Sequence, residues 1–152
     1  MPADRPDDFS VRYAWQEGSL PPPYHYSYEV TIAADGSGQV TFMPDYGFSD
    51  PPIWNETFSL DAAQMDALYQ QMLDAEVFSR SWAESDDIPV GGSSDVLDVT
   101  AAGNTLTVPA FPASGSDQAD QAKQAVYSAV PGDIWERLNA QRDQYVQEHE
   151  AP

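Results

Sequence analysis

Two stretches of the chain alternate apolar and polar side chains, and this pattern constrains the fold more than any other feature of the sequence. The first begins at Tyr24, where every second residue as far as Ile32 is aromatic or aliphatic. This is the two-residue period of a half-buried strand. The turn residues of 35–38 follow, so the stretch predicts a β-hairpin. A three-residue turn at 35–37 would pair Ile32 with Val40 and Val30 with Phe42.

The second alternating stretch spans residues 97–108 and contains the turn-forming pair Gly103-Asn104. A two-residue loop at that pair would place Val99 opposite Val108 and Ala101 opposite Leu106, which keeps apolar residues opposite apolar residues. We therefore expect a second hairpin here.

Helical signals separate and follow the hairpins. Asp61 and Gln64 fit a capping box, and apolar residues at helical spacing continue to about Ala75. Asp117 is a candidate cap for a second helix, and Asp133 with Glu136 fits a capping box for a third. With one more strand expected at 54–58, the order predicts an α+β fold. Its antiparallel sheet has about five strands, from two hairpins and one single strand, with helices packed on one face.

The chain length favours one domain with a single hydrophobic core. Residues 1–23 are rich in Pro and Asp and predict an irregular N-terminal arm, anchored by Phe9, Tyr13 and Trp15. The single α+β domain is then expected over residues 24–152.

Acidic residues dominate the charge of the chain. It carries 25 acidic and 6 basic residues, a net charge of -19, and Lys123 is its one lysine. The acids are spread evenly, so the charge disfavours binding to nucleic acid and to acidic membranes. This pattern favours a halophilic protein, because concentrated salt screens the repulsion between carboxylates. An acidic protein that mimics DNA is the alternative, and it would gather its acids on one face.

The sequence contains no cysteine, which excludes disulfides and thiolate chemistry. Its first residues lack a basic start and an apolar run, and no stretch approaches the length of a membrane span. We therefore expect a cytoplasmic protein that does not enter a membrane. A signal peptide removed beforehand would leave the same pattern.

Part of the chain resembles a known group of domains. The Leu-Asp-x-x-Gln element that opens LDAAQMDALYQQMLDAEVF, followed by the hairpin DVLDVTAAGNTLTV, is similar to bacterial domains of the emfourin kind. Those domains resemble small protein inhibitors of metallopeptidases. The likeness covers roughly residues 30–110 and implies a small sheet with a helix and an inhibitor-type role. It leaves the N-terminal arm and the C-terminal helices unmatched, and it implies no site residues.

The stretch VGGSSDVLDV places Gly91 and Gly92 before a predicted strand. A phosphate-binding glycine loop opens a helix instead, so we interpret these glycines as residues that let the chain approach the sheet edge. Ser93 and Ser94 would need a base to act as nucleophiles. Only His25 and His149 exist; His25 is expected to point outward and His149 lies in a polar C-terminal segment.

The best candidate for a binding surface is the loop at 43–54, in which Tyr46, Phe48 and Trp54 are interleaved with Pro and Gly. The pattern also allows these aromatics to fold back onto the core. Tyr24, Tyr26 and Tyr28 are interpreted as core residues beneath a helix, although such a stripe can also stack on sugar rings or a partner.

We therefore expect a non-catalytic protein-binding or inhibitor-type module without metal or cofactor, with Tyr46, Phe48, Trp54, Gly91 and Gly92 as candidate contact residues. The partner is expected to be another protein, and the sequence leaves the oligomeric state open. A small hydrolase-like enzyme that uses loop carboxylates is an alternative, but an acid-base pair cannot be picked from the 25 acids without geometry. Asp45, Asp50, Asp86 and Asp87 lie in predicted loops and could share a cation, although the pattern favours solvated loop acids.

The halophilic interpretation predicts how stability depends on salt. The melting temperature should rise from low salt to about 2 M KCl, because salt screens carboxylate repulsion and favours the hydrated compact state. Thermal melts followed by circular dichroism over this range measure the effect. A flat or falling curve contradicts the interpretation.

Overall fold

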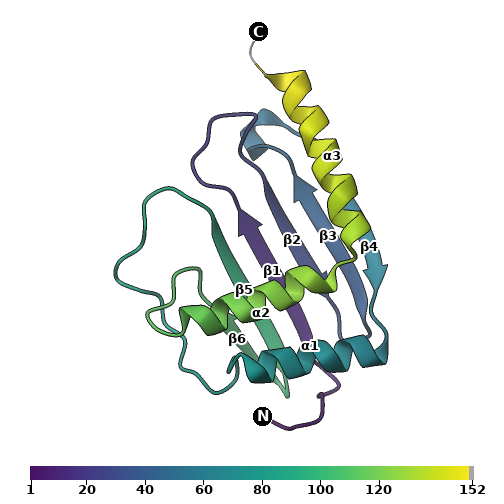
Figure 1. Cartoon of the computed structure of the whole chain (residues 1–152), viewed down its shortest axis with the longest axis vertical. Helices are drawn as coiled ribbons and strands as arrows, with labels where there is room; N and C mark the ends of the chain where they lie inside the picture. Colours follow the sequence, from purple (N-terminus) through teal and green to yellow (C-terminus); the bar gives the residue numbers. More distant parts are fainter. Residues whose placement is uncertain (151–152) are drawn as a thin grey trace.

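A computed structural model describes residues 1–150 and shows one antiparallel sheet with three helices on one of its faces (Figure 1). The α+β class is thus confirmed, but the sheet has six strands where about five were predicted. The last two residues of the predicted domain 24–152 lie outside the described part. The strands are β1 (Ser10–Gln16), β2 (Ser27–Ile32), β3 (Ser37–Met43), β4 (Trp54–Ser59), β5 (Ser94–Ala101) and β6 (Asn104–Val108), and the helices are α1 (Ala62–Asp74), α2 (Ser116–Ala129), α3 (Gly132–His149) and the short 3₁₀ turn η1 (Gly47–Ser49).

The strand that sequence reasoning missed, β1, lies inside the sheet. The strand order is β4-β3-β2-β1-β5-β6, and β1 pairs with β2 on one side and with β5 on the other. The prediction of an irregular arm over residues 1–23 is therefore wrong for residues 10–16. Val11, Tyr13 and Trp15 alternate toward the helices, so the two-residue period was present but too short to stand out beside the surrounding Pro and Asp residues.

Both hairpins form, but each register differs from the predicted one by two residues. Val30 pairs with Val40 in the first hairpin, and Val99 pairs with Leu106 in the second. The second turn uses Ala102 and Gly103, both with positive φ, as a two-residue turn between twisted strands requires. A shift of two residues leaves every side chain on its predicted face.

The first helix begins as predicted, whereas the other two begin differently. The Asp61 carboxylate accepts a hydrogen bond from the Gln64 amide, and the Gln64 side chain accepts one from the Asp61 amide. Neither α2 nor α3 has a side-chain cap. Their N-cap residues are Gly115 and Pro131, so the predicted caps Asp117 and Asp133 lie inside the first helical turn.

The hydrophobic core lies between the helices and the sheet. The side chains of β1, β2, β3 and β5 that face the helices pack against α1, α2 and α3. The largest fully buried side chains of this core include Tyr69, Phe9, Phe42, Ile32, Met65 and Leu68. None of the helices in the described part of the chain combines the length and apolar character that crossing a membrane requires.

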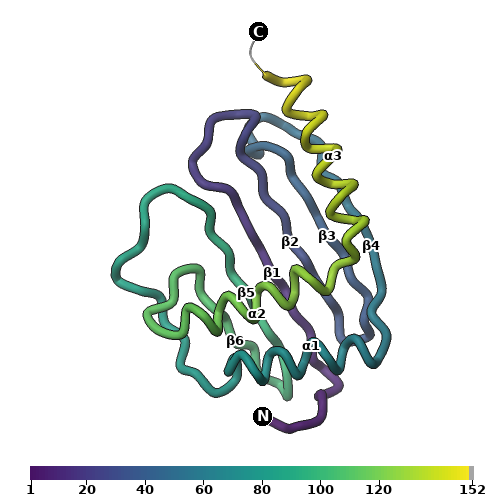
Figure 2. The backbone as a smooth tube through the Cα atoms, viewed as in Figure 1, coloured from purple at the N-terminus to yellow at the C-terminus, as the bar shows by residue number. Residues whose placement is uncertain are grey.

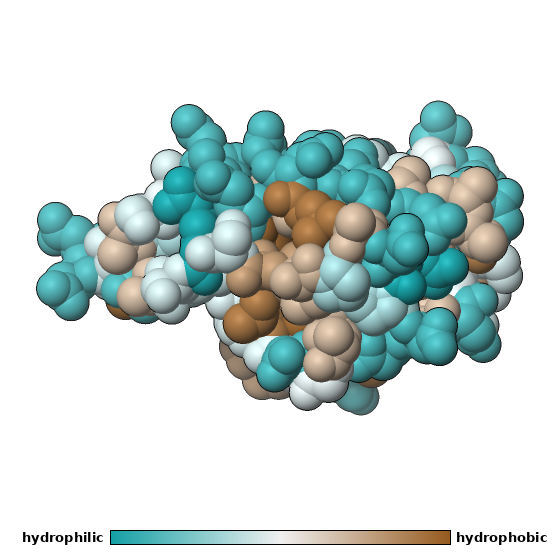
Figure 3. Space-filling view, turned by 90° about the horizontal axis from the view of Figure 1, so that it is seen from below, coloured by the Kyte–Doolittle hydropathy of each residue, from teal (hydrophilic) through white to brown (hydrophobic). Residues whose placement is uncertain are grey.

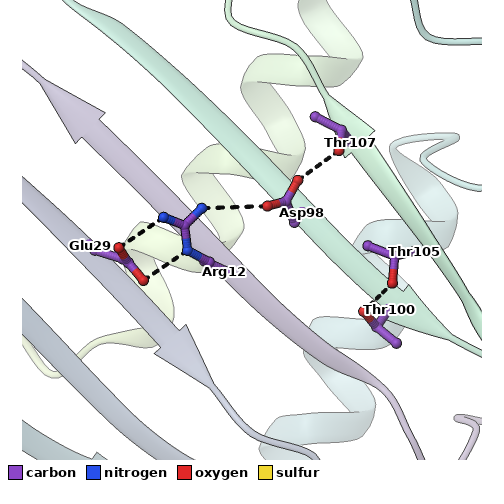
Figure 4. Close-up of polar contacts among 6 residues, drawn as sticks. All are labelled: Arg12, Glu29, Asp98, Thr100, Thr105 and Thr107. Carbon is purple, nitrogen blue, oxygen red and sulfur yellow. Dashed lines mark hydrogen bonds and ion pairs between the residues drawn. The ribbon is translucent and has the colours of Figure 1, made fainter.

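Within residues 1–150, no helix covers the other face of the sheet, and Figure 4 shows six polar side chains on it. At its centre the Arg12 guanidinium donates two hydrogen bonds to the Glu29 carboxylate and one to Asp98. Asp98 also accepts a hydrogen bond from the Thr107 hydroxyl, so a polar row spans four strands. The charged side chains of this row are therefore paired with one another through charge-assisted hydrogen bonds.

Strand direction places several loops at the same end of the sheet, which we call the loop end. It consists of residues 17–26 between β1 and β2, residues 44–53 between β3 and β4, and residues 86–93 before β5. Figure 2 shows the first two of these loops at the end of the sheet opposite to α1. At the α1 end, the Asp8 carboxylate accepts hydrogen bonds from the amides of Ala102 and Gly103, and the pKa of Asp8 is lowered by these bonds.

Candidate functional site

Four of the five predicted contact residues lie in the loops of the loop end, whereas the fifth, Trp54, is the first residue of β4. Tyr46, Gly91 and Gly92 line one hollow of about 330 Å³ together with His25. Trp54 lines a second hollow of about 310 Å³ beside α3. Phe48 is 79% exposed and projects into solvent.

Tyr46 connects two of the loops. Its ring stacks on the ring of His25 with 3.9 Å between centroids, and its hydroxyl donates a hydrogen bond of 2.6 Å to the carbonyl of Leu20. On the side of its own loop, Phe48 stacks on it at 4.9 Å. Tyr46 therefore holds two loops of the loop end together. Phe48 contacts Tyr46 on one face and is otherwise exposed to solvent.

His25 was expected to point outward, and this prediction is wrong. The residue is only 9% exposed, and its Nδ1 donates to the carbonyl of Gly18 at 3.1 Å. The strand begins at Ser27, so the alternation counted from Tyr24 does not apply to His25. Of the tyrosines expected in the core, Tyr26 and Tyr28 pack against it, whereas Tyr24 is exposed.

A close backbone contact at the loop end depends on Gly18 rather than on the predicted glycines. A Cβ atom added at Gly18 would lie 2.6 Å from the amide nitrogen of Gly92, so the loops at 17–26 and 86–93 touch through their backbones. Gly91 and Gly92 both have positive φ, a conformation that favours glycine. A Cβ atom at Gly91 or Gly92 would meet no atom within 4 Å, so the structure gives these two glycines a role in backbone conformation and not the predicted role in close approach.

Helix α3 is hydrogen-bonded to two loops of the loop end. The Asp45 carboxylate is 3% exposed and accepts hydrogen bonds from the Tyr145 hydroxyl and from the Tyr46 amide. Burial and then the hydrogen bond to Asp45 raise the pKa of Tyr145 to about 12. Arg142 adds a hydrogen bond to the carbonyl of Tyr24.

Exposed apolar side chains concentrate at the loop end. Among the residues that the structure describes, seven large hydrophobic side chains are exposed, and all except Met1 lie in the three loops. Val90 is fully exposed at 102%. Each loop contributes two of them, and the six are Leu20, Tyr24, Phe48, Ile53, Ile88 and Val90.

At the opposite end of the molecule, the apolar side chains are arranged differently. Figure 3 shows that end, where an apolar area is surrounded by hydrophilic residues. A hollow at this end of the strands is lined partly by Val11 and Ile32, each at most 5% exposed. Apolar atoms there lie in a recess, whereas those of the loop end project outward.

The residues considered for catalysis are engaged in structural contacts. Ser94 accepts a hydrogen bond from Gln16, and His25 is held by Gly18 although it borders the same hollow as Ser94. His149 is bonded to the carbonyl of Tyr145 in its own helix. Within residues 1–150, no group of three or more His, Cys, Asp or Glu is arranged to hold a metal ion.

No protein-family model matches this chain, and no curated protein sequence matches it.

The geometry predicts effects of different size for the two stacked loop aromatics. Replacing Tyr46 by Ala removes the stacking on His25 and the hydrogen bond to Leu20, so the free energy of unfolding should fall by about 1–3 kcal/mol. Phe48→Ala should change it by less than about 0.5 kcal/mol, because the side chain is exposed. Urea unfolding of both variants measures these values. Equal effects would contradict the assigned roles.

Proposed function

We propose that this chain is a non-catalytic protein-binding module of the inhibitor type, adapted to high salt, and that it holds its partner with the loop end. The observation that carries the proposal is the concentration of the six exposed apolar side chains in three adjoining loops. Exposed apolar side chains gathered on one part of a soluble protein are characteristic of a protein-interaction surface.

The loop at 86–93 is held at both of its ends. On one side, Ser85 donates to the carbonyl of Phe111 and Ala113 donates to the carbonyl of Ala83. On the other side, Gly92 lies against Gly18. Ile88 and Val90 are exposed between these two anchors. A loop fixed in this way loses less conformational entropy on binding, which favours affinity.

The proposed adaptation to salt is consistent with the sparse ion pairing. Seven ion-pair contacts join basic residues to acids within residues 1–150, and most of the 25 acids take no part in them. In concentrated salt, long-range electrostatics is screened, and apolar contact becomes the main source of affinity. An apolar loop end on an acidic protein suits that solvent.

The inhibitor type is the narrower part of the proposal. It draws on the resemblance of residues 30–110 to domains of the emfourin kind and on the exposed Ile88 and Val90 of the anchored loop, which could enter a cleft of the partner. The alternative of a DNA mimic draws on the charge alone. No described contact favours the enzyme alternative over this proposal.

A matched pair of variants tests the proposed function. The loop variant carries Phe48→Ser, Ile88→Ser and Val90→Ser. The control variant carries Ala63→Ser, Ala67→Ser and Gln71→Ser, three exposed positions of α1 at the other end of the sheet. Immobilised wild-type protein and both variants are incubated with native extract in 2 M KCl. The wild type and the control should retain a common protein that the loop variant loses, while all three keep similar melting temperatures.

A second assay addresses the inhibitor type. The chain is titrated against a zinc metallopeptidase such as thermolysin with a quenched fluorescent peptide as substrate. Inhibition by the wild type and the control, but not by the loop variant, supports the inhibitor role. Retention of the same proteins by the loop variant would contradict binding through the loop end, and equal peptidase activity with and without the chain counts against an inhibitor of this class.

A further inference from the structure

Four aromatic rings form a ladder across the helix-covered face of the sheet. Trp15, Tyr28, Phe42 and Trp54 occupy directly paired positions on β1, β2, β3 and β4. Their successive centroids lie 5.2, 6.1 and 5.7 Å apart, and successive ring planes differ by 15°, 15° and 22°. The spacing between strands, about 4.8 Å, sets this stacking. Each inner ring therefore has a neighbour on both of its faces.

The ladder stops at Trp15, although the sheet continues to β5. The residue paired with Trp15 on β5 is Asp95, which supplies a carboxylate in place of a fifth ring. Within residues 1–150, the ring partners of Trp15 are Tyr28 and Tyr26, which both come from the β2 side. The ring face turned toward β5 thus has no aromatic partner.

A hollow of about 310 Å³ opens at this end of the ladder. Its floor includes Trp15, Tyr28 and Asp95 from three adjacent strands, and its wall includes Asp120 and Tyr127 from α2. The volume is at the lower limit of small-molecule sites, which matches one ring-sized group.

The carboxylate at the base of the hollow is held in place. Asp95 accepts a hydrogen bond from the Lys123 ammonium at 2.8 Å and another from the Tyr13 hydroxyl at 2.8 Å. Lys123 is 4% exposed, and its two other hydrogen bonds go to the carbonyls of Asp95 and Pro109. With three acceptors, the ammonium group has no donor left for a ligand. Within residues 1–150, each carboxylate oxygen of Asp95 accepts one of these two hydrogen bonds and no other, which leaves it able to accept a second.

These features select the chemistry of a ligand. An apolar ring face beside carboxylate acceptors suits a molecule with a C–H face and several hydroxyl donors. Anions are disfavoured, because the chain carries a net charge of -19 and the lysine of the hollow is already saturated. We propose that this hollow binds one sugar unit of a neutral glycan, with the sugar ring stacked on Trp15 and its hydroxyls donating to Asp95 and Asp120. The proposal does not rest on the function assigned to the loop end.

The test is titration calorimetry with four neutral tetrasaccharides: maltotetraose, cellotetraose, mannotetraose and tetra-N-acetylchitotetraose. At least one should bind the wild type. Trp15→Leu removes the stacking face and should weaken binding at least about tenfold. Asp120→Asn removes a charged acceptor and should weaken it about tenfold. The matched control is Asp117→Asn, an exposed acid on the same helix outside the hollow, which should leave binding unchanged.

The loop variant provides a second control, because it should bind the sugar as the wild type does. If Trp15→Leu does not fold, the proposal is tested by the comparison of glycan binding to Asp120→Asn and to Asp117→Asn alone. Tetramethylammonium is titrated in parallel, since aromatic faces also attract cations. The proposal is overturned if none of the four glycans binds at 10 mM, on the order of the weakest useful affinity. It is also overturned if Asp120→Asn binds as well as Asp117→Asn, or if tetramethylammonium alone binds.

Discussion

The pairing of β1 between β2 and β5 is the constraint on which the rest of the structure depends. Without it, the strands β2, β3 and β4 and the hairpin of β5 and β6 would be two separate sheets. Because β1 runs antiparallel to both neighbours, the strand directions alternate across the whole sheet. That alternation brings the three loops of the loop end together, although they are far apart in the sequence. The position of β1 thus determines where a binding surface can form.

Strand β1 also contacts the residues that hold α2 against the sheet. Tyr13 donates a hydrogen bond to Asp95 of β5, and Asp95 pairs with Lys123 of α2. A buried charge is tolerated only when it is paired and hydrogen-bonded, so the lysine fixes α2 against the sheet at this point. Two residues further along β1, Trp15 begins the aromatic ladder. One strand therefore connects the core, the hollow beneath α2 and the loop end.

Sequence patterns predicted the elements with strong periodicity and missed what depends on distant pairing. The capping box at Asp61 and the faces of both hairpins followed from local spacing. Strand β1 has the same alternation over only seven residues, and its place inside the sheet depends on pairing with β5, which lies far along the chain. The exact registers depended on turn geometry, which composition does not specify.

Some candidate contact residues could be selected from the sequence, whereas others became visible only in the structure. Tyr46 and Phe48 were selected as candidates because aromatics in a Pro- and Gly-rich loop are conspicuous, but spacing could not show that Tyr46 contacts a second loop whereas Phe48 is exposed. Ile88 and Val90 were missed, because an apolar residue in a loop gives no sign of its exposure. The hollow at Trp15 was beyond sequence reasoning, since it needs the order of the strands.

Amide hydrogen exchange measured residue by residue in 2 M KCl tests the central position of β1 most directly. The amides of Val11 and Tyr13 should exchange as slowly as that of Leu97 on β5, through unfolding of the whole domain, because neighbouring strands flank β1 on both sides. Residues 86–93 should exchange fastest. Exchange of the β1 amides at the rate of that loop, with β5 still protected, would contradict the account.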